Sequence, residues 1–246
     1  RSLLKSLSKI DQDNDYFIVT NAETGTDFAP VFPRFRVLQQ NIHGKNRPLR
    51  ILFEQFSLPR LLRNLGADVL FNPGFTGPGK PGIPAVTVFH DLQHVRHPEY
   101  FKRRDLPFWN YLLRQSAKTS TAIIAVSEAT RRDVIQHYSL PAEKVTAIHH
   151  GVDEEFFSLK RAPATTAPLL LCVSTLHPHK NIERLVLVCG HLHPDFPSLR
   201  LVLAGMRGFR TQQIEALIRD LSLNESVLLT GWIPRWELME LFAKAT

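Results

Sequence analysis

Short apolar runs alternate along the chain with longer runs whose apolar residues recur every three or four positions. The runs AVTVFHD (85–91) and AIIAVS (122–127) have the length and β-branched content of buried strands. The run DLPFWNYLLRQSAKT (105–119) has the period of a helix. The same alternation predicts further strands at 16–20, 67–73, 145–150, 169–174, 199–205 and 226–232, and further helices at 51–65, 128–138, 181–192, from Thr211 and from Pro234. Such a rhythm is typical of α/β proteins with parallel sheets.

Two local signals refine these expectations. Pro59 lies inside the helical pattern of 51–65 and should kink or break it, because proline has no N–H to donate. Ser127 stands directly before the helical run 128–138 and is placed to cap it.

A change of composition divides the chain. The stretch SLKRAPATTAP (158–168) is predicted to be a linker between an N-terminal domain, 1–157, and a partial C-terminal domain, 169–246. Both domains are expected to be doubly wound, so ligands should bind beyond the carboxyl ends of the strands. If the domains face each other, the loops after their strands line one cleft.

The composition of the chain says more about its binding partners than about its fold. The 246 residues carry a net charge of +7, and the basic residues are spread rather than gathered into a patch interleaved with aromatics. This favours anionic small molecules or an anionic surface over nucleic acid, with a merely solvated basic face as the alternative. The two cysteines are expected to be reduced core thiols. No apolar run approaches the ~20 residues that span a bilayer, and the ends of the chain suggest a fragment of a longer protein.

The junction VSTLHPHKN (173–181) offers a site for an anion. Lys180 lies between a predicted strand and the start of the next predicted helix. A cation there is repelled by the positive end of the helix dipole. An anion bound between the ammonium and the helix N-terminus would remove this unfavourable electrostatic interaction. Asn181 could cap the backbone or hydrogen-bond the ligand. The alternative is a solvated lysine beside an ordinary cap.

A second group of polar residues follows the strand at 85–91. His90 and Asp91 fall at its carboxyl end, where an imidazole beside a carboxylate can orient a hydroxyl or share a proton. The spacing to His94 and His97 also resembles a metal site, but it lacks the glutamate of H-E-x-x-H, and His97 precedes a proline. A histidine that only caps a loop is the other alternative.

Two glycines add weaker signals. Gly205 ends the predicted strand 199–205 and opens the loop after it, where a plain turn is the alternative to a role in binding phosphate. Gly151 in IHHGVDEEFF marks either a hinge or a ligand contact.

The order of these segments resembles the family 4 retaining glycosyltransferases of the GT-B fold. The resemblance rests on HDLQHVRHPEYF, AVSEATRRDV, IHHGVDEEFF, VSTLHPHKN, LVLAG and LTGWIPRWELMELFAKA, and it covers nearly the whole chain. It implies two Rossmann-like domains, the C-terminal one binding a nucleotide-diphosphate sugar and the N-terminal one the acceptor, with the nucleotide sugar as substrate and no metal or cofactor.

The resemblance also assigns residues. It implies that Lys180 contacts the donor pyrophosphate, that Gly205 lies near the nucleotide, and that His90, followed by Asp91, contacts the transferred sugar. Thr175 stands where many members carry an arginine. Asn181, next to Lys180, completes the expected donor-binding group.

The chain departs from the family pattern at both ends. The family's first strand with its glycine-rich loop and the later E-x7-E segment are not found in it, so the second domain is expected to be incomplete and the fragment inactive alone.

Other readings stay open. They are a nucleotide-sugar epimerase or phosphorylase-like enzyme, and an inactive α/β scaffold; a nicotinamide dehydrogenase fits poorly because no G-x-G-x-x-G follows a strand. The resemblance implies sugar, lipid-linked or small-molecule acceptors and a cytoplasmic protein, with possible peripheral contact at the inner face of the membrane.

Overall fold

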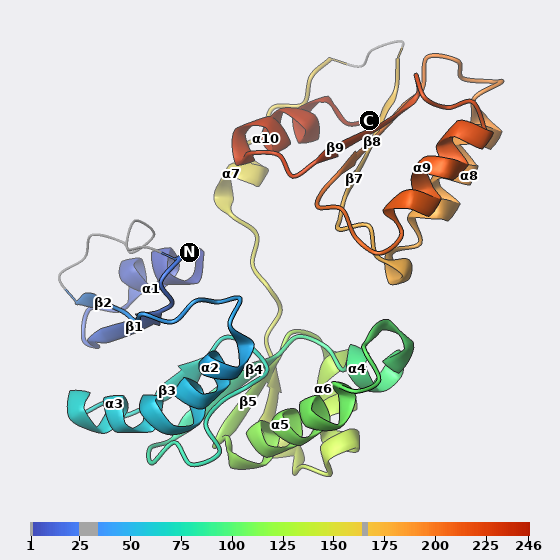
Figure 1. Ribbon diagram of the computed structural model, residues 1–246. Helices are drawn as coiled ribbons and strands as arrows, with labels where there is room; N and C mark the ends of the chain where they lie inside the picture. The colour runs from blue at the N-terminus through green and yellow to red at the C-terminus, as the bar shows by residue number, and fades with distance from the viewer. Residues whose placement is uncertain (1, 25–33, 164–166) are drawn as a thin grey trace. The chain divides into compact units, whose positions relative to one another are not determined.

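The computed structural model describes residues 2–24, 34–163 and 167–246. The chain forms two compact units, residues 1–151 and 152–246 (Figure 1). Part of the predicted linker, residues 164–166, lies outside the described residues. The boundaries 1–157, 158–168 and 169–246 stay predictions.

The first unit holds six strands and six α-helices among its described residues. The strands are β1 (Tyr16–Thr20), β2 (Phe35–Gln39), β3 (Leu70–Asn72), β4 (Ala85–Phe89), β5 (Ala122–Ala125) and β6 (Val145–Ala147). The helices are α1 (Ser2–Ile10), α2 (Arg47–Leu52), α3 (Leu58–Leu65), α4 (Gln93–Arg96), α5 (Leu106–Thr119) and α6 (Glu128–Tyr138). Short helical turns are η1 (Phe53–Ser57), η2 (Pro98–Tyr100) and η3 (Ala142–Lys144). Strands β1 and β2 pair with each other, and β3-β4-β5-β6 form a second sheet, with every pair parallel.

The second unit repeats the same plan. It contains α7 (Glu154–Phe157), β7 (Leu169–Val173), η4 (Pro178–Lys180), α8 (Ile182–Leu192), β8 (Arg200–Ala204), α9 (Thr211–Asp220), β9 (Val227–Gly231) and α10 (Arg235–Lys244). Its sheet β7-β8-β9 is parallel and has α8 and α9 on one side and α10 on the other (Figure 1). The predicted α/β fold with parallel sheets is confirmed.

Each unit has its own apolar core. In the second unit, fully buried side chains of α8 and α9, such as Val186 and Ile214, pack on Leu201 of β8. In the first unit, Phe89 of β4 and Val134 of α6 belong to the corresponding core. Because the helices bury these faces against the sheets, the loops that follow the strands are held at fixed places along one edge.

The predicted break at Pro59 takes an unusual form. Residues 47–65 remain helical, but the turn Phe53–Ser57 is a π-helix that ends two residues before the proline. Proline removes an N–H and crowds the carbonyl four residues back, which the wider π turn accommodates. Ser127 caps α6 as expected, since its Oγ accepts the Thr130 N–H at 3.1 Å. Strand β2 is the one regular strand of the described residues that the sequence pattern missed.

Candidate functional site

The first group of candidate residues follows β4 in the first unit. His90 comes directly after this strand, and its Nε2 lies 2.9 Å from the Pro73 carbonyl oxygen. Since a carbonyl oxygen only accepts, Nε2 carries the hydrogen. The His90 ring also meets Phe75 edge to face at 5.4 Å and stacks on His150 at 5.6 Å between ring centres. The imidazole is therefore held by two other segments, one that follows β3 and one that follows β6.

Asp91, the next residue, is exposed. Its Oδ1 accepts the Gln93 N–H at 3.0 Å, which fixes the turn that leads into α4. The same residue borders a cavity of about 220 Å³ in the first unit, which is otherwise lined by Phe75, Gln93, His94, Phe101, Trp109 and Leu113. This cavity is mostly aromatic and apolar, with one carboxylate and one imidazole on its wall.

The other two histidines of this segment, His94 and His97, contact other residues. His94 is 6% exposed, and its burial lowers the pKa of the imidazole below 6.5; nearby His137 lowers it further, whereas Asp91 acts in the opposite direction. The Tyr138 hydroxyl lies 3.4 Å from His94 Nε2. His97 pairs with Glu99 at 3.0 Å. In the part of the chain that the structure describes, no group of three or more His, Cys, Asp or Glu side chains is arranged to hold a metal ion.

The second group of candidate residues lies at the carboxyl ends of β7 and β8. The loops after these strands are interlocked by backbone hydrogen bonds, including Leu176 N to Met206 O at 3.2 Å. Gly205 has φ +149°, and a Cβ there would lie 2.2 Å from the Ser174 carbonyl oxygen. Gly208 would bring a Cβ to 2.4 Å from the Leu176 carbonyl oxygen. Only glycine permits this approach, so packing alone explains Gly205.

Lys180 and Asn181 follow in the same loop. Lys180 ends the turn η4, and Asn181, with φ +52°, occupies the N-cap position of α8. Both side chains are exposed, and the Asn181 side chain makes no capping hydrogen bond. The capping role considered for Asn181 is therefore not realised. The first N–H groups of α8 are left without a side-chain acceptor, which is a favourable place for an anion.

Two arginines of the second unit, Arg207 and Arg210, differ from Lys180 in one respect. Arg207 pairs with Glu215 at 2.7 Å, and Arg210 lies 3.7 Å from Glu183. Lys180 makes no ion pair with any residue that the structure describes. Its ammonium is close enough to Cys172 to oppose the rise in the pKa of that thiol caused by burial.

The predicted site residues thus fall into two groups. Thr175, Lys180, Asn181 and Gly205 lie together at one edge of the second unit, and His90 with Asp91 lies at the corresponding edge of the first. The roles of all six stay predictions. Sequence reasoning missed the contact with His150. Its place at the carboxyl end of the predicted strand 145–150 puts it at the same edge as His90, but nothing in the sequence shows that the two rings stack.

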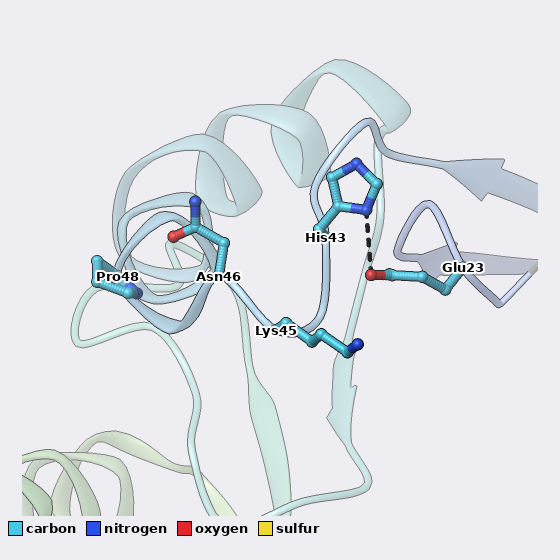
Figure 2. Close-up of a pocket in the computed structure, with 5 residues that line it drawn as sticks. All are labelled: Glu23, His43, Lys45, Asn46 and Pro48. Atoms are coloured by element: carbon cyan, nitrogen blue, oxygen red, sulfur yellow. Dashed lines mark hydrogen bonds and ion pairs between the residues drawn. The ribbon is translucent and has the colours of Figure 1, made fainter.

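A larger hollow of about 730 Å³ in the first unit is bordered by Glu23, His43, Lys45, Asn46 and Pro48. Figure 2 shows the His43 ring turned toward Glu23, with Nδ1 and Oε1 3.1 Å apart. Glu23 also accepts the Gly44 N–H, which is the main reason that the pKa of its carboxyl is lowered. The carboxylate is therefore already satisfied, and the hollow shares no residue with the cavity beside Asp91.

None of the helices in residues 2–24, 34–163 and 167–246 has the length and apolar character needed to cross a membrane.

Known proteins of related sequence match part of this chain. The chain is 26% identical over 174 residues to the O-antigen chain mannosyltransferase B of Escherichia coli, a match that covers 65% of the chain and 45% of that protein. The chain therefore spans less than half the length of this curated relative.

Two solved structures share the fold. WaaG, described as a glycosyltransferase involved in lipopolysaccharide biosynthesis, matches with a TM-score of 0.61 at 16% identity, over 88% of this chain and 62% of that one. Anabaena Alr3699/HepE, solved in complex with UDP and glucose, matches with a TM-score of 0.55 at 18% identity, over 81% of this chain and 56% of that one.

Family models divide the chain close to the boundary between its compact units. Residues 153–246 match the model described as Glycosyl transferases group 1, and residues 1–156 match the one described as Glycosyltransferase Family 4. The chain belongs to glycosyltransferase family 4, with the two-part α/β architecture of its GT-B relatives.

Proposed function

We propose that the protein transfers a sugar from a nucleotide-diphosphate sugar to an acceptor hydroxyl. The observation that carries the proposal is the exposed Lys180, without an ion pair among the described residues, beside the uncapped N-terminus of α8. Side chain and helix end offer positive charge at one place, and a diphosphate supplies the matching negative charge. Family membership supports the same assignment, as does the UDP in the complex of the Anabaena relative.

The chemistry that fits these residues is displacement of the diphosphate. The bond between the sugar C1 and the diphosphate oxygen breaks, and the oxygen leaves with the electron pair. Lys180 and the N–H groups of α8 stabilise the charge that develops on it. We propose that the acceptor oxygen bonds to C1 from the face that the diphosphate leaves, and that a phosphate oxygen takes its proton. The anomeric configuration is then retained.

We assign the binding of the transferred sugar and of the acceptor to the first unit. His90 is already fixed in orientation, and an imidazole in that position can hydrogen-bond a sugar hydroxyl. The cavity beside Asp91 offers an apolar wall for the acceptor or for part of the sugar. The acceptor class proposed is a sugar, lipid-linked or small-molecule hydroxyl, reached in the cytoplasm or at the inner face of the membrane, without a metal cofactor.

The test is product analysis with the full-length protein and a panel of uridine, guanosine and thymidine diphosphate sugars. The expected result is transfer with release of the nucleoside diphosphate, and a product with the same anomeric configuration as the donor sugar, read from the one-bond coupling between C1 and H1. Activity should survive addition of EDTA. Conversion of the donor sugar without transfer would instead favour an epimerase. Inversion of configuration would contradict the retaining mechanism, and loss of activity on chelation would contradict the metal-independent site.

A further inference from the structure

The His90 imidazole is held more closely than a loop histidine requires. Pro73 and Phe75 belong to the segment after β3, and His150 follows β6, so segments that follow the two edge strands of this sheet converge on one ring. Thr130 adds a hydrogen bond from its hydroxyl to the His90 carbonyl oxygen at 3.2 Å. The backbone and the side chain of His90 are therefore both fixed.

The hydrogen bond to Pro73 decides which ring nitrogen is left for a ligand. Nε2 donates to the carbonyl oxygen, so neutral His90 carries its hydrogen on Nε2 and a lone pair on Nδ1. No residue of the described chain hydrogen-bonds Nδ1. A sugar hydroxyl can therefore donate to Nδ1, but it cannot use the hydrogen on Nε2.

We propose that His150 is a positioning residue for His90: by stacking on the imidazole it keeps Nε2 on the Pro73 carbonyl and leaves Nδ1 to the substrate. The rings lie 5.6 Å apart and 20° from parallel, within the range of stacked aromatic pairs. Phe75 meets the ring edge to face, 70° from parallel. Because the His150 ring is parallel to the imidazole and the Phe75 ring is nearly perpendicular to it, rotation of His90 away from Pro73 would break its contacts with both rings.

This inference rests on the proposed function for its effect on transfer, but the orientation of His90 can be measured without it. The matched variants are His150→Phe, which keeps an aromatic face, and His150→Ala, which removes it. His149→Ala is the control, because His149 is an exposed neighbouring histidine for which the structure records no contact with His90.

The first measurement is the ¹⁵N spectrum of the His90 ring in the full-length protein labelled at histidine, at about pH 8, where an ordinary histidine is neutral. The His90 signals are those missing in His90→Gln. In the parent protein, His150→Phe and His149→Ala, Nδ1 should resonate as an unprotonated nitrogen and Nε2 as a protonated one. In His150→Ala the chemical shifts of Nδ1 and Nε2 should approach each other, because the ring then exchanges between its two tautomers. Unchanged His90 signals in His150→Ala would overturn the proposal, as would an equal change in His149→Ala.

The second measurement is steady-state transfer. A stacked pair contributes enough for kcat to fall by about three- to tenfold in His150→Ala, while the donor KM changes by less than about twofold. His150→Phe should recover most of kcat. Absence of transfer by the parent protein would refute the proposed function and leave the spectroscopic result standing. A drop in kcat that His150→Phe does not rescue would refute the positioning role.

Discussion

The two groups of candidate residues occupy the same position in two similar sheets, but their side chains are satisfied in different ways. In the first unit, the polar groups beside His90 are partnered within the protein, through Pro73, Gln93 and Thr130. In the second unit, Lys180 has no ion pair among the described residues, and Asn181 caps nothing. The first edge is therefore arranged to hold a side chain in one orientation, whereas the second is left with positive charge that an anion would neutralise.

The buried layers beneath the two edges differ in a related way. Below the first, Thr87 is fully buried and accepts hydrogen bonds from Asn72 Nδ2 at 3.0 Å and Ser120 Oγ at 2.7 Å. Below the second, the buried core is apolar, and the loops are held by close backbone packing at Gly205 and Gly208. The buried Thr211 hydroxyl adds to this, since it accepts the Gly208 N–H and donates to the Gly208 carbonyl oxygen. The first edge thus rests on buried hydrogen bonds between side chains, whereas the second rests mainly on close backbone packing. The following predictions test this difference.

The largest effect is expected from Gly205→Ala. The new methyl group would lie 2.2 Å from the Ser174 carbonyl oxygen, at a φ of +149° that alanine rarely adopts. Overpacking and backbone strain together should lower the free energy of unfolding by about 3 kcal/mol. The measurement is chemical denaturation followed by circular dichroism. Gly74→Ala is the control, since a Cβ there meets nothing within 4 Å. Equal stability of the two variants would show that the loops can move apart freely.

A smaller effect is expected from Thr87→Val in the first unit. Valine has nearly the shape of threonine but no hydroxyl, so the buried Asn72 amide loses its acceptor. The free energy of unfolding should fall by about 2 kcal/mol. Thr146→Val on β6, two strands away in the same sheet, is the control, because Thr146 is exposed; its effect should stay within about 0.5 kcal/mol. If Thr87→Val were no more destabilising than Thr146→Val, the buried hydrogen bonds would not support this edge.

The smallest effect concerns pH. Burial holds the pKa of His94 below 6.5 in the folded protein, so between that lowered pKa and 6.5 the unfolded chain binds more protons. Stability from this group is complete above 6.5 and is lost as pH falls from 6.5 to the folded pKa. His137, whose pKa is also lowered by burial, adds to the trend, and Asp91 acts against it.

The measurement is urea denaturation at about pH 7.5 and about pH 5.5, which lie above and below the ordinary histidine pKa. The free energy of unfolding should fall less between these two pH values in His94→Gln than in the parent protein. The control His149→Gln, at an exposed histidine, should behave like the parent protein. The same loss in His94→Gln as in the parent protein would contradict the assignment.

The sequence predicted the fold well where its periodic signals were strong. Strand β1 and helices α6 and α8 were predicted to within one residue of their observed bounds, because their apolar residues follow one period without interruption and Ser127 marks where α6 begins. It missed β2, because the run FRVLQ carries the polar residues Arg36 and Gln39 and gives only a weak strand signal. It foresaw a break near Pro59, but composition could not show that the chain would stay helical through a π turn.

The candidate site was only partly predictable. The positions of His90 and Lys180 followed from the rule that loops after parallel strands gather at one edge. The stacking of His150 on His90 could not be predicted, because it depends on the register of β4, β5 and β6 and not on sequence spacing. The close approach of Gly205 to Ser174 depends in the same way on the pairing of β7 with β8.

The central claim is that Lys180 and the N-terminus of α8 bind the diphosphate of a nucleotide. Calorimetric titration of the full-length protein with UDP, GDP and dTDP tests it most directly. At least one nucleotide should bind, and Lys180→Ala should weaken that binding by more than about tenfold, equivalent to ~1.4 kcal/mol. Lys160→Ala, at another exposed lysine of the same unit, should change it by less than about twofold. Equal binding by the parent protein and Lys180→Ala, or no binding of any nucleotide, would contradict the account.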